Sequence, residues 1–259
     1  MSARRVERLE IGPGRSVLLT GDLHLEGPGS PEAELFLAFA REAASPDRTL
    51  VVAGDLFYYY FENARKPVER FRWLLDELAE AAEGWGGVVL MHGNRDFLLG
   101  GTRTFPDGLA TAGDFLLLDF GGRRALATHG DLFLRGDRAY YAFRRFMRSA
   151  PAVWFTRHVP PALGVRLADG LRWISFRRGK DRGFAPPDYD KIRAAAAEHG
   201  ADEVYFGHFH RAMEPSDFPF DEPACWCLGA WEGGSAPVLA ADAEGVRLAD
   251  ARDFVRHGG

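Results

Sequence analysis

The chain has 259 residues, of which 46% are hydrophobic, and it carries a formal net charge of −5. This length suffices for one large domain or two small ones with a sizeable core. No apolar run approaches the roughly 20 residues of a membrane span, and the N-terminal segment lacks the apolar centre of a secretory signal, so we expect a cytoplasmic protein.

Strand-like and helix-like patterns alternate along the chain. Apolar runs that end at a glycine are typical of buried strands, and five of them lie at 16–21, 49–54, 87–93, 124–130 and 203–207. Segments 31–44 and 67–83 each place apolar residues on one helical face. Further short strands are predicted at 225–229, 237–241 and 246–248. The alternation predicts an α/β sandwich that forms a single domain, residues 1–259.

Residues 133–185 interrupt this alternation. Between 133 and 182 the chain has twelve Arg or Lys and only three Asp, and the same stretch is rich in aromatic residues. This composition predicts a basic, aromatic helical cap inserted in the domain. Because the rest of the chain is acidic, we expect no nucleic-acid partner.

The two cysteines, Cys225 and Cys227, stand two residues apart in a strand-like run. A disulfide across this spacing would be badly strained, so we expect two reduced thiols in the core. The sequence has no Cys-rich spacing of the kind that binds structural zinc.

Polar side chains stand where the five apolar runs end. The motifs there are GDLH at 21–24, GD at 54–55, HGNRD at 92–96, HGD at 129–131 and GHFH at 207–210. Because strand ends deliver side chains to one edge of a sheet, we expect these residues to converge. The candidate metal ligands are Asp22, His24, Asp55, Asn94, His129, His208 and His210. Carboxylate, imidazole and amide ligands without a thiolate suit Mn, Fe, Zn, Co or Mg.

The spacing of these ligands indicates a site for two ions. Asp22 and His24 leave a strand on the same side and could share one ion, whereas His208 and His210 follow a strand end and could face different ions. The carboxylate of Asp55 is suited to bridge two cations, which together activate water and stabilise displacement at phosphorus. A lone Asp after a glycine is more often a turn or cap residue, and a lone His a core residue. Five such motifs in one chain favour the metal site and phosphoester hydrolysis.

The order of the five motifs resembles that of the calcineurin-like metallophosphoesterases, over nearly the whole chain. The resemblance implies a four-layer α/β sandwich of two mixed β-sheets flanked by helices, with the helical cap inserted at 133–185. It also implies two divalent ions, for which manganese is the favoured identity. By motif position, one ion would be held by Asp22, His24, Asp55 and His210. The other would be held by Asp55, Asn94, His129 and His208.

Within this family the chain is most similar to the UDP-2,3-diacylglucosamine pyrophosphohydrolases of lipid A biosynthesis. The similar segments are 92–100, 129–144 and 228–231, together with the cap. The resemblance implies a nucleotide-linked glycolipid substrate, UDP-2,3-diacylglucosamine, that is cleaved to UMP and 2,3-diacylglucosamine 1-phosphate. It assigns catalytic roles to Asn94, Arg95 and His129. The substrate-binding residues that it implies are Arg95, Asp137, Tyr140, Lys180 and His208.

Arg95 occupies a position where most of the family carries His. A His there could protonate an alkoxide leaving group, whereas Arg, which stays charged, can only stabilise an anionic phosphate. This favours a leaving group that needs no proton, as in cleavage of a pyrophosphate. The structural alternative is that Arg95 pairs with Asp96 or another acid. We expect His92 to contact a ligand residue or to lie in the core rather than to bind metal, and Asp96 and Asp131 to orient the ligands beside them.

The cap has two interpretations. Its aromatic residues could line an acyl-chain groove or contact the inner surface of the membrane, with arginines on anionic headgroups or the diphosphate. Alternatively, Phe143, Phe146, Met147 and Ala150 are ordinary helix-packing positions below a solvated Arg face. We favour the first, because the positive charge exceeds what packing requires.

Three departures leave other substrates open. Phe209 replaces a small hydroxyl residue, the run 56–63 after Asp55 is rich in tyrosine, and segment 173–188 lacks the expected polar spacing around Lys180. The alternatives are a related enzyme acting on another nucleotide diphosphate derivative or phosphodiester, and a non-catalytic scaffold for a protein partner. Because all seven ligand positions are filled, the scaffold is disfavoured. The sequence makes no prediction of the oligomeric state.

Overall fold

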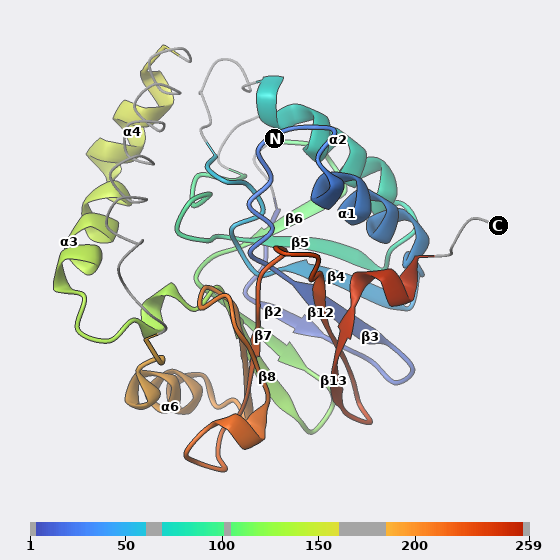
Figure 1. Ribbon diagram of the computed structural model, residues 1–259, viewed down its shortest axis with the longest axis vertical. Coiled ribbons are helices and arrows are strands. Elements are labelled where there is room, and N and C mark those ends of the chain that lie inside the picture. The colour runs from blue at the N-terminus through green and yellow to red at the C-terminus, as the bar shows by residue number, and fades with distance from the viewer. Residues whose placement is uncertain (1–3, 61–68, 101–104, 161–184, 256–259) are drawn as a thin grey trace.

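The computed structural model describes residues 4–60, 69–100, 105–160 and 185–255. Two β-sheets pack face to face, and helices cover their outer faces (Figure 1). The first sheet has the order β1 (Arg4–Arg5), β6 (Leu109–Ala112), β5 (Gly87–Met91), β4 (Arg48–Val52), β3 (Ser16–Thr20), β12 (Pro237–Asp242) and β13 (Val246–Asp250). The second has the order β10 (Ala212–Met213), β11 (Ala224–Leu228), β9 (Glu203–Phe206), β8 (Arg124–Thr128), β7 (Phe115–Asp119) and β2 (Arg8–Glu10).

Both sheets are mixed. In the first, β3 to β6 run parallel, and β12 pairs antiparallel with β3. In the second, β8, β9 and β11 run parallel, and β7 is antiparallel to β8. Since parallel neighbours end at the same edge, the residues after β3, β4 and β5 lie close together, as do those after β8 and β9.

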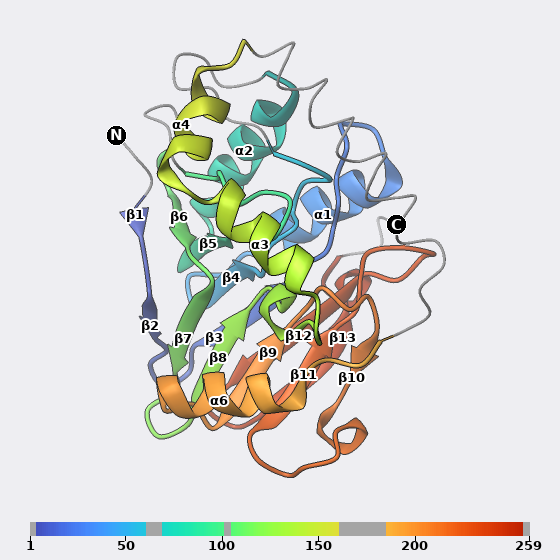
Figure 2. The same cartoon turned by 90° about the vertical axis from the view of Figure 1, so that its left-hand side faces the viewer.

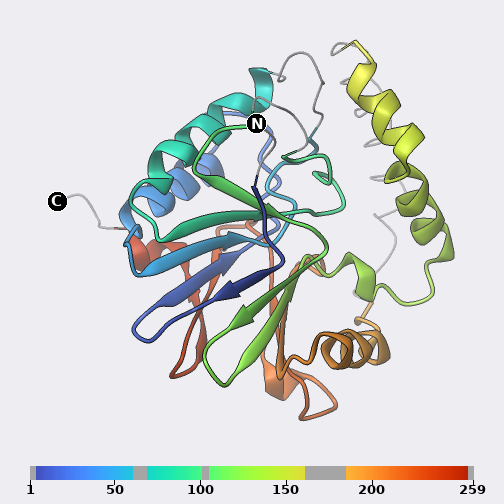
Figure 3. The same cartoon turned by 180° about the vertical axis from the view of Figure 1, so that it is seen from behind.

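Alternating side chains of each strand serve two different cores. On β3, Leu18 joins the core beneath α1 (Pro31–Glu42) and α2 (Glu69–Ala82), whereas Val17 and Leu19 pack between the two sheets. Leu126 of β8 faces a third core beneath α6 (Tyr189–His199). The layers are therefore helix, sheet, sheet and helix, and the predicted four-layer sandwich is confirmed (Figures 1 and 3).

Helix α1 shows how local sequence defines an outer layer. The Ser30 hydroxyl caps its first turn by accepting from the amide of Ala33 at 3.1 Å, and Pro31 opens the helix, where its missing amide costs nothing. Phe36 and Phe39 are fully buried on the predicted face. The helix ends at Glu42, two residues before the predicted end.

Two cap helices leave the sandwich after the short 3-10 helix η1 (Asp131–Phe133). They are α3 (Arg138–Met147) and α4 (Ala150–His158), and they stand beside the sheets rather than on them (Figures 1 and 2). Neither contains a buried residue. They fall within the predicted cap, of which residues 161–184 lie outside the described part of the chain, so the boundaries 133–185 stay a prediction.

The structure also bears on the two cysteines and on membrane-spanning helices. Cys225 and Cys227 on β11 are free and buried, as predicted. Burial raises the pKa of the Cys225 thiol to about 12. Across the described residues, none of the helices combines the length and the apolar character required to traverse a membrane.

Candidate metal centre

The seven predicted ligands gather at one edge of the sandwich. Asp22 and His24 follow β3, Asp55 follows β4, and Asn94 follows β5. His129 follows β8 directly, and the pair His208 and His210 follows β9. Both sheets thus contribute to one cluster.

Five of these ligands have a strained backbone. Within the described residues, the non-glycine positions with positive φ are Asp22 (54°), His24 (50°), Asp55 (51°), His208 (72°) and His210 (52°). This left-handed region costs an ordinary residue about 1–3 kcal/mol, and such residues cluster at functional sites. The strain therefore coincides with the predicted metal centre.

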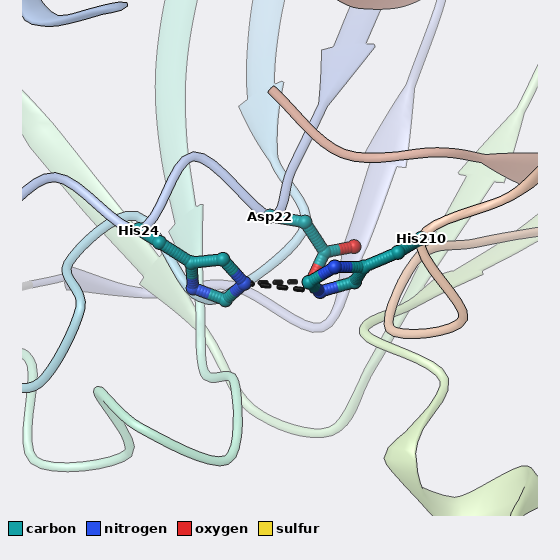
Figure 4. A group of neighbouring side chains, drawn as sticks. All are labelled: Asp22, His24 and His210. Atoms are coloured by element: carbon teal, nitrogen blue, oxygen red, sulfur yellow. Dashed lines mark hydrogen bonds and ion pairs between the residues drawn. The ribbon is translucent and has the colours of Figure 1, made fainter. Parts of the chain in front are cut away.

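One half of the centre consists of Asp22, His24 and His210 (Figure 4). The Nε2 atoms of His24 and His210 face each other at 3.1 Å, and Asp22 Oδ1 lies 3.9 Å from the first and 3.7 Å from the second. Asp22 Oδ1 and His24 Nδ1 are buried without a hydrogen-bond partner in the described structure. A buried polar atom without a partner is costly, and a cation bound between the three side chains would satisfy Asp22 Oδ1.

The other half consists of Asn94, His129 and His208. Asn94 Oδ1 lies 2.8 Å from His129 Nε2 and 3.1 Å from His208 Nδ1, and the two imidazole nitrogens are 3.2 Å apart. The second ring nitrogen of His129, Nδ1, donates to the carbonyl of Ala53 at 3.1 Å, which directs Nε2 into the cluster.

Asp55 lies between the two halves. Its Oδ2 is 3.8 Å from His24 Nδ1 and 3.7 Å from His129 Nε2. Ligand atoms of Asp22, Asp55 and His129 also fall within 4.8 Å of one another. A carboxylate in this place can reach ions on both sides, as the bridging assignment requires.

The electrostatics of the cluster fit a divalent cation. Burial and the charge of Arg95 lower the pKa of His24 to about 2, and burial lowers that of His208 to about 3, so both imidazoles are neutral, the form that binds metals. Burial alone would lower the pKa of His129, but Asp55 and Asp22 outweigh it and raise the value to about 9. The carboxylates thus favour a positive charge at His129, which a metal ion can supply in place of a proton.

Close packing of glycines makes the cluster possible. A Cβ on Gly93 would lie 2.2 Å from Asp55 Oδ1, and one on Gly207 would lie 2.3 Å from Asp22 Oδ2. Both glycines belong to the sequence motifs that supply Asn94 and His208. Their lack of a side chain lets the backbone approach the carboxylates.

Arg95 borders the centre beside Asp55. Its Nε lies 3.3 Å from Asp55 Oδ2, its amide donates to Asp55 Oδ1 at 2.9 Å, and its guanidinium lies over the ring of Tyr58 at 4.7 Å. The structural alternative for Arg95, an ion pair with an acid, is found. The acid is Asp55 and not Asp96. Asp96 instead accepts backbone hydrogen bonds, in line with its expected orienting role.

Two other predicted substrate residues, Asp137 and Tyr140, lie at the start of α3. Asp137 caps α3 by accepting from the amide of Tyr140 at 2.9 Å, and the Tyr140 hydroxyl donates to Asp131. Lys180 lies outside the described residues. His92 is placed away from the ligands, with Nε2 donating to the carbonyl of Leu99 at 3.0 Å. The roles of Asp137, Tyr140 and Lys180 in substrate binding stay predictions.

Sequence reasoning missed three residues that support the centre. The amide of Trp231 donates to the carbonyl of Asp22 at 3.2 Å. Arg144 and Arg148 of the cap both pair with Asp114, which follows β6. The spacing of the two arginines, four residues apart on one helical face, is the signal that could have identified them.

The chain is similar to several known proteins. A family model described as Calcineurin-like phosphoesterase matches residues 15–212. A protein named UDP-2,3-diacylglucosamine hydrolase from Pseudomonas aeruginosa PAO1 is 32% identical over 90% of this chain and 98% of its own length. A protein of the same name from Azotobacter vinelandii is 34% identical over 90% of this chain and 97% of its own. A solved structure of Vacuolar Protein Sorting 29 from Cryptosporidium parvum covers 93% of each chain at 13% identity and a TM-score of 0.45.

Proposed function

The chain belongs to the calcineurin-like phosphoesterase family, as a metal-dependent hydrolase, and we propose that it cleaves the diphosphate of UDP-2,3-diacylglucosamine to UMP and 2,3-diacylglucosamine 1-phosphate. The observation that carries this proposal is the extent of similarity. Relatives named for this substrate are 32–34% identical and align with 90% of the chain.

The placement of Arg95 supports a diphosphate substrate. Its guanidinium sits at the edge of the ligand cluster, held by Asp55 on one side and the Tyr58 ring on the other. A fixed guanidinium binds phosphate oxygens well and cannot release a proton to a leaving group. We assign Arg95 to hold the phosphate groups and to stabilise the phosphate monoester that leaves.

The proposed ligand sets are those named from the sequence. Asp22, His24, Asp55 and His210 would hold one ion, and Asp55, Asn94, His129 and His208 would hold the other. When bound, such a pair lowers the pKa of water toward neutrality and offsets charge that develops at phosphorus. His208 would also contact the substrate phosphates, and Asn94 and His129 would help to hold the second ion. The proposed ion is Mn²⁺, which accepts this mixture of oxygen and imidazole ligands.

The cap is proposed to receive the acyl chains and to contact the cytoplasmic surface of the membrane. Four large apolar side chains of α3 and α4 are exposed, namely Phe143 (47%), Phe146 (63%), Trp154 (62%) and Phe155 (55%). The alternative that Phe143 and Phe146 pack within the fold does not agree with this exposure. Aromatic side chains beside arginines suit the boundary between acyl chains and anionic headgroups. Asp137, Tyr140 and Lys180 are proposed to contribute to substrate binding.

The proposal is tested by measuring UMP release from UDP-2,3-diacylglucosamine with added Mn²⁺, for the wild type and for Asp55→Ala. We expect release that depends on Mn²⁺ and is lost in the variant. Metal-dependent cleavage of a water-soluble phosphodiester or another nucleotide diphosphate derivative, without UMP release from the lipid, would overturn the substrate. Absence of any metal-dependent hydrolysis would contradict the assignment as a whole.

A further inference from the structure

Two arginines, Arg144 of α3 and Arg148 directly after it, attach the cap to two loops of the metal centre. At the C-terminal end of the helix, Arg148 donates from Nη2 to the carbonyl oxygen of Gly93 at 3.1 Å, directly before Asn94. One turn earlier, Arg144 donates from Nε to Asp131 Oδ2 at 2.8 Å, two residues after His129. A single helix therefore contacts both loops.

Asp114 connects these contacts into one network. Its Oδ1 accepts from Arg144 Nη2 at 2.6 Å and also from Arg148. The side chains of Arg144 and Arg148 are only 15% and 21% exposed, and Asp131 is almost fully buried. Charged contacts shielded in this way are stronger than ion pairs on an open surface.

Arg148 and Asp96 hold the two successive peptide groups that flank the Cα of Gly93. The amide of Gly93 donates to Asp96 Oδ1 at 2.8 Å, and the carbonyl of Gly93 accepts from Arg148. Gly93 leads directly into Asn94, whose Oδ1 lies between His129 and His208. The position of Arg148 thus influences where the Asn94 side chain points.

The other half of the centre is supported from elsewhere. Asp22 receives a backbone hydrogen bond from Trp231 at 3.2 Å, and the amide of His24 donates to the carbonyl of Asp55 at 3.0 Å. In the described part of the chain, the hydrogen bonds and ion pairs of Arg144 and Arg148 do not reach Asp22, His24 or His210. The support from α3 is therefore confined to one half.

We propose that Arg144 and Arg148 are positioning residues for the ion of Asn94, His129 and His208 only. The inference rests on the proposed metal-dependent function and deepens it. Because the cap contacts only one of the two ligand sets, the affinities for the two ions can change independently. A shift in the position of α3 changes the affinity for one ion and not the affinity for the other.

The test is a Mn²⁺ titration followed by electron paramagnetic resonance of free Mn²⁺, with no substrate present. For Arg148→Met we expect one of two ions to bind about tenfold to a hundredfold more weakly, the usual effect of losing a group that orients a ligand. Arg148→Lys should recover part of the loss. The matched control is Arg145→Met, which removes the same charge from an exposed position of the same helix. Circular dichroism verifies that each variant is folded.

Double variants identify the affected ion. In a His24→Ala background, Arg148→Met should weaken the ion that remains, whereas in an Asn94→Ala background it should have no further effect. Equal weakening of both ions, or no weakening at all, would overturn the inference. A wild type that binds two Mn²⁺ but releases no UMP would contradict the substrate and leave this inference intact. A wild type that binds no Mn²⁺ would overturn both.

Discussion

Asp96 holds the backbone of Asp55 in its left-handed conformation. Asp96 Oδ1 accepts from the amide of Asp55 at 3.2 Å, and Oδ2 accepts from the amide of Leu56 at 2.8 Å. Together with the amide of Gly93, three buried donors depend on this one carboxylate. Asp55, which is proposed to bridge the two ions, is thus kept in place by an acid outside the proposed ligand set.

Asp96→Ala should strongly destabilise the protein. It leaves three buried amides without an acceptor, and each such group costs about 1–3 kcal/mol, so we expect a loss of about 3 kcal/mol or more in the free energy of unfolding. Asp96→Asn keeps one acceptor oxygen and should lose less. Urea denaturation in the presence of a chelator measures both. Equal stability of the two variants and the wild type would refute the role of Asp96.

Gly93→Ala should disrupt the metal centre, whereas Gly12→Ala should not. The added methyl at position 93 would lie 2.2 Å from Asp55 Oδ1 and 2.4 Å from the Asp55 amide, so backbone must move. At position 12 there is no atom within 4 Å. Calorimetric Mn²⁺ titration should show at least about tenfold weaker binding for the first and an unchanged affinity for the second. Unchanged binding in both would contradict the close approach.

Asp114→Asn should remove part of the acid sensitivity of the fold. Burial alone would raise the pKa of Asp114, but Arg144 and Arg148 outweigh it and lower the pKa below its ordinary value. A lowered folded-state pKa means that this carboxylate stabilises the protein above the unfolded-state pKa of about 3.9, and that the contribution disappears as the pH falls through the folded-state value. The Tm of Asp114→Asn should therefore lie below that of the wild type at neutral pH, and the gap should narrow below about pH 4.

Thermal melts from pH 7 to pH 2 measure this gap. Asp190→Asn is the control, since Asp190 pairs with Arg193 of the same helix and its side chain is 85% exposed. A gap for Asp114→Asn that stays constant across the range would show that the carboxylate charge is not the cause.

Tyr58→Leu should weaken substrate binding through Arg95, whereas Tyr58→Phe should have little effect. The guanidinium of Arg95 lies over the Tyr58 ring, and the phenyl ring of Phe preserves that face. A cation–π contact contributes about 0.5–2 kcal/mol, so we expect kcat/KM for the diphosphate to fall about twofold to thirtyfold in the leucine variant. Steady-state kinetics with saturating Mn²⁺ measure the change. Equal losses in both variants would indicate a role for the hydroxyl and not the ring face.

The strand ends were predictable because each motif follows an apolar run within the same short segment. The runs before Asp22, Asp55 and Asn94 are the parallel strands β3, β4 and β5, and their polar residues meet at one edge, as expected. The bounds of α1 and α2 were also close, since burial of Phe36 and Leu74 follows the helical spacing of the sequence.

Contacts between distant segments were not predictable in the same way. Pairing of β12 with β3 joins Leu239 to Leu19, and neither run specifies the other as its partner. Arg148 and Asp114 are likewise separated by 34 positions, and a basic helix could equally have left its arginines in water. Two arginines of the cap are therefore engaged with acids of the protein, whereas the sequence assigned the cap charge to lipid or substrate.

The left-handed conformation of five ligand residues implies a conflict between heat resistance and catalysis. Glycine adopts this conformation without steric penalty, and Asn tolerates it better than His or Asp. A substitution to glycine at position 22, 24, 55, 208 or 210 would therefore remove backbone strain from the metal-free protein. It would also remove a proposed metal ligand. Laboratory evolution for thermal tolerance alone would drift toward inactive sequences at these sites, so any such library needs a simultaneous screen for turnover.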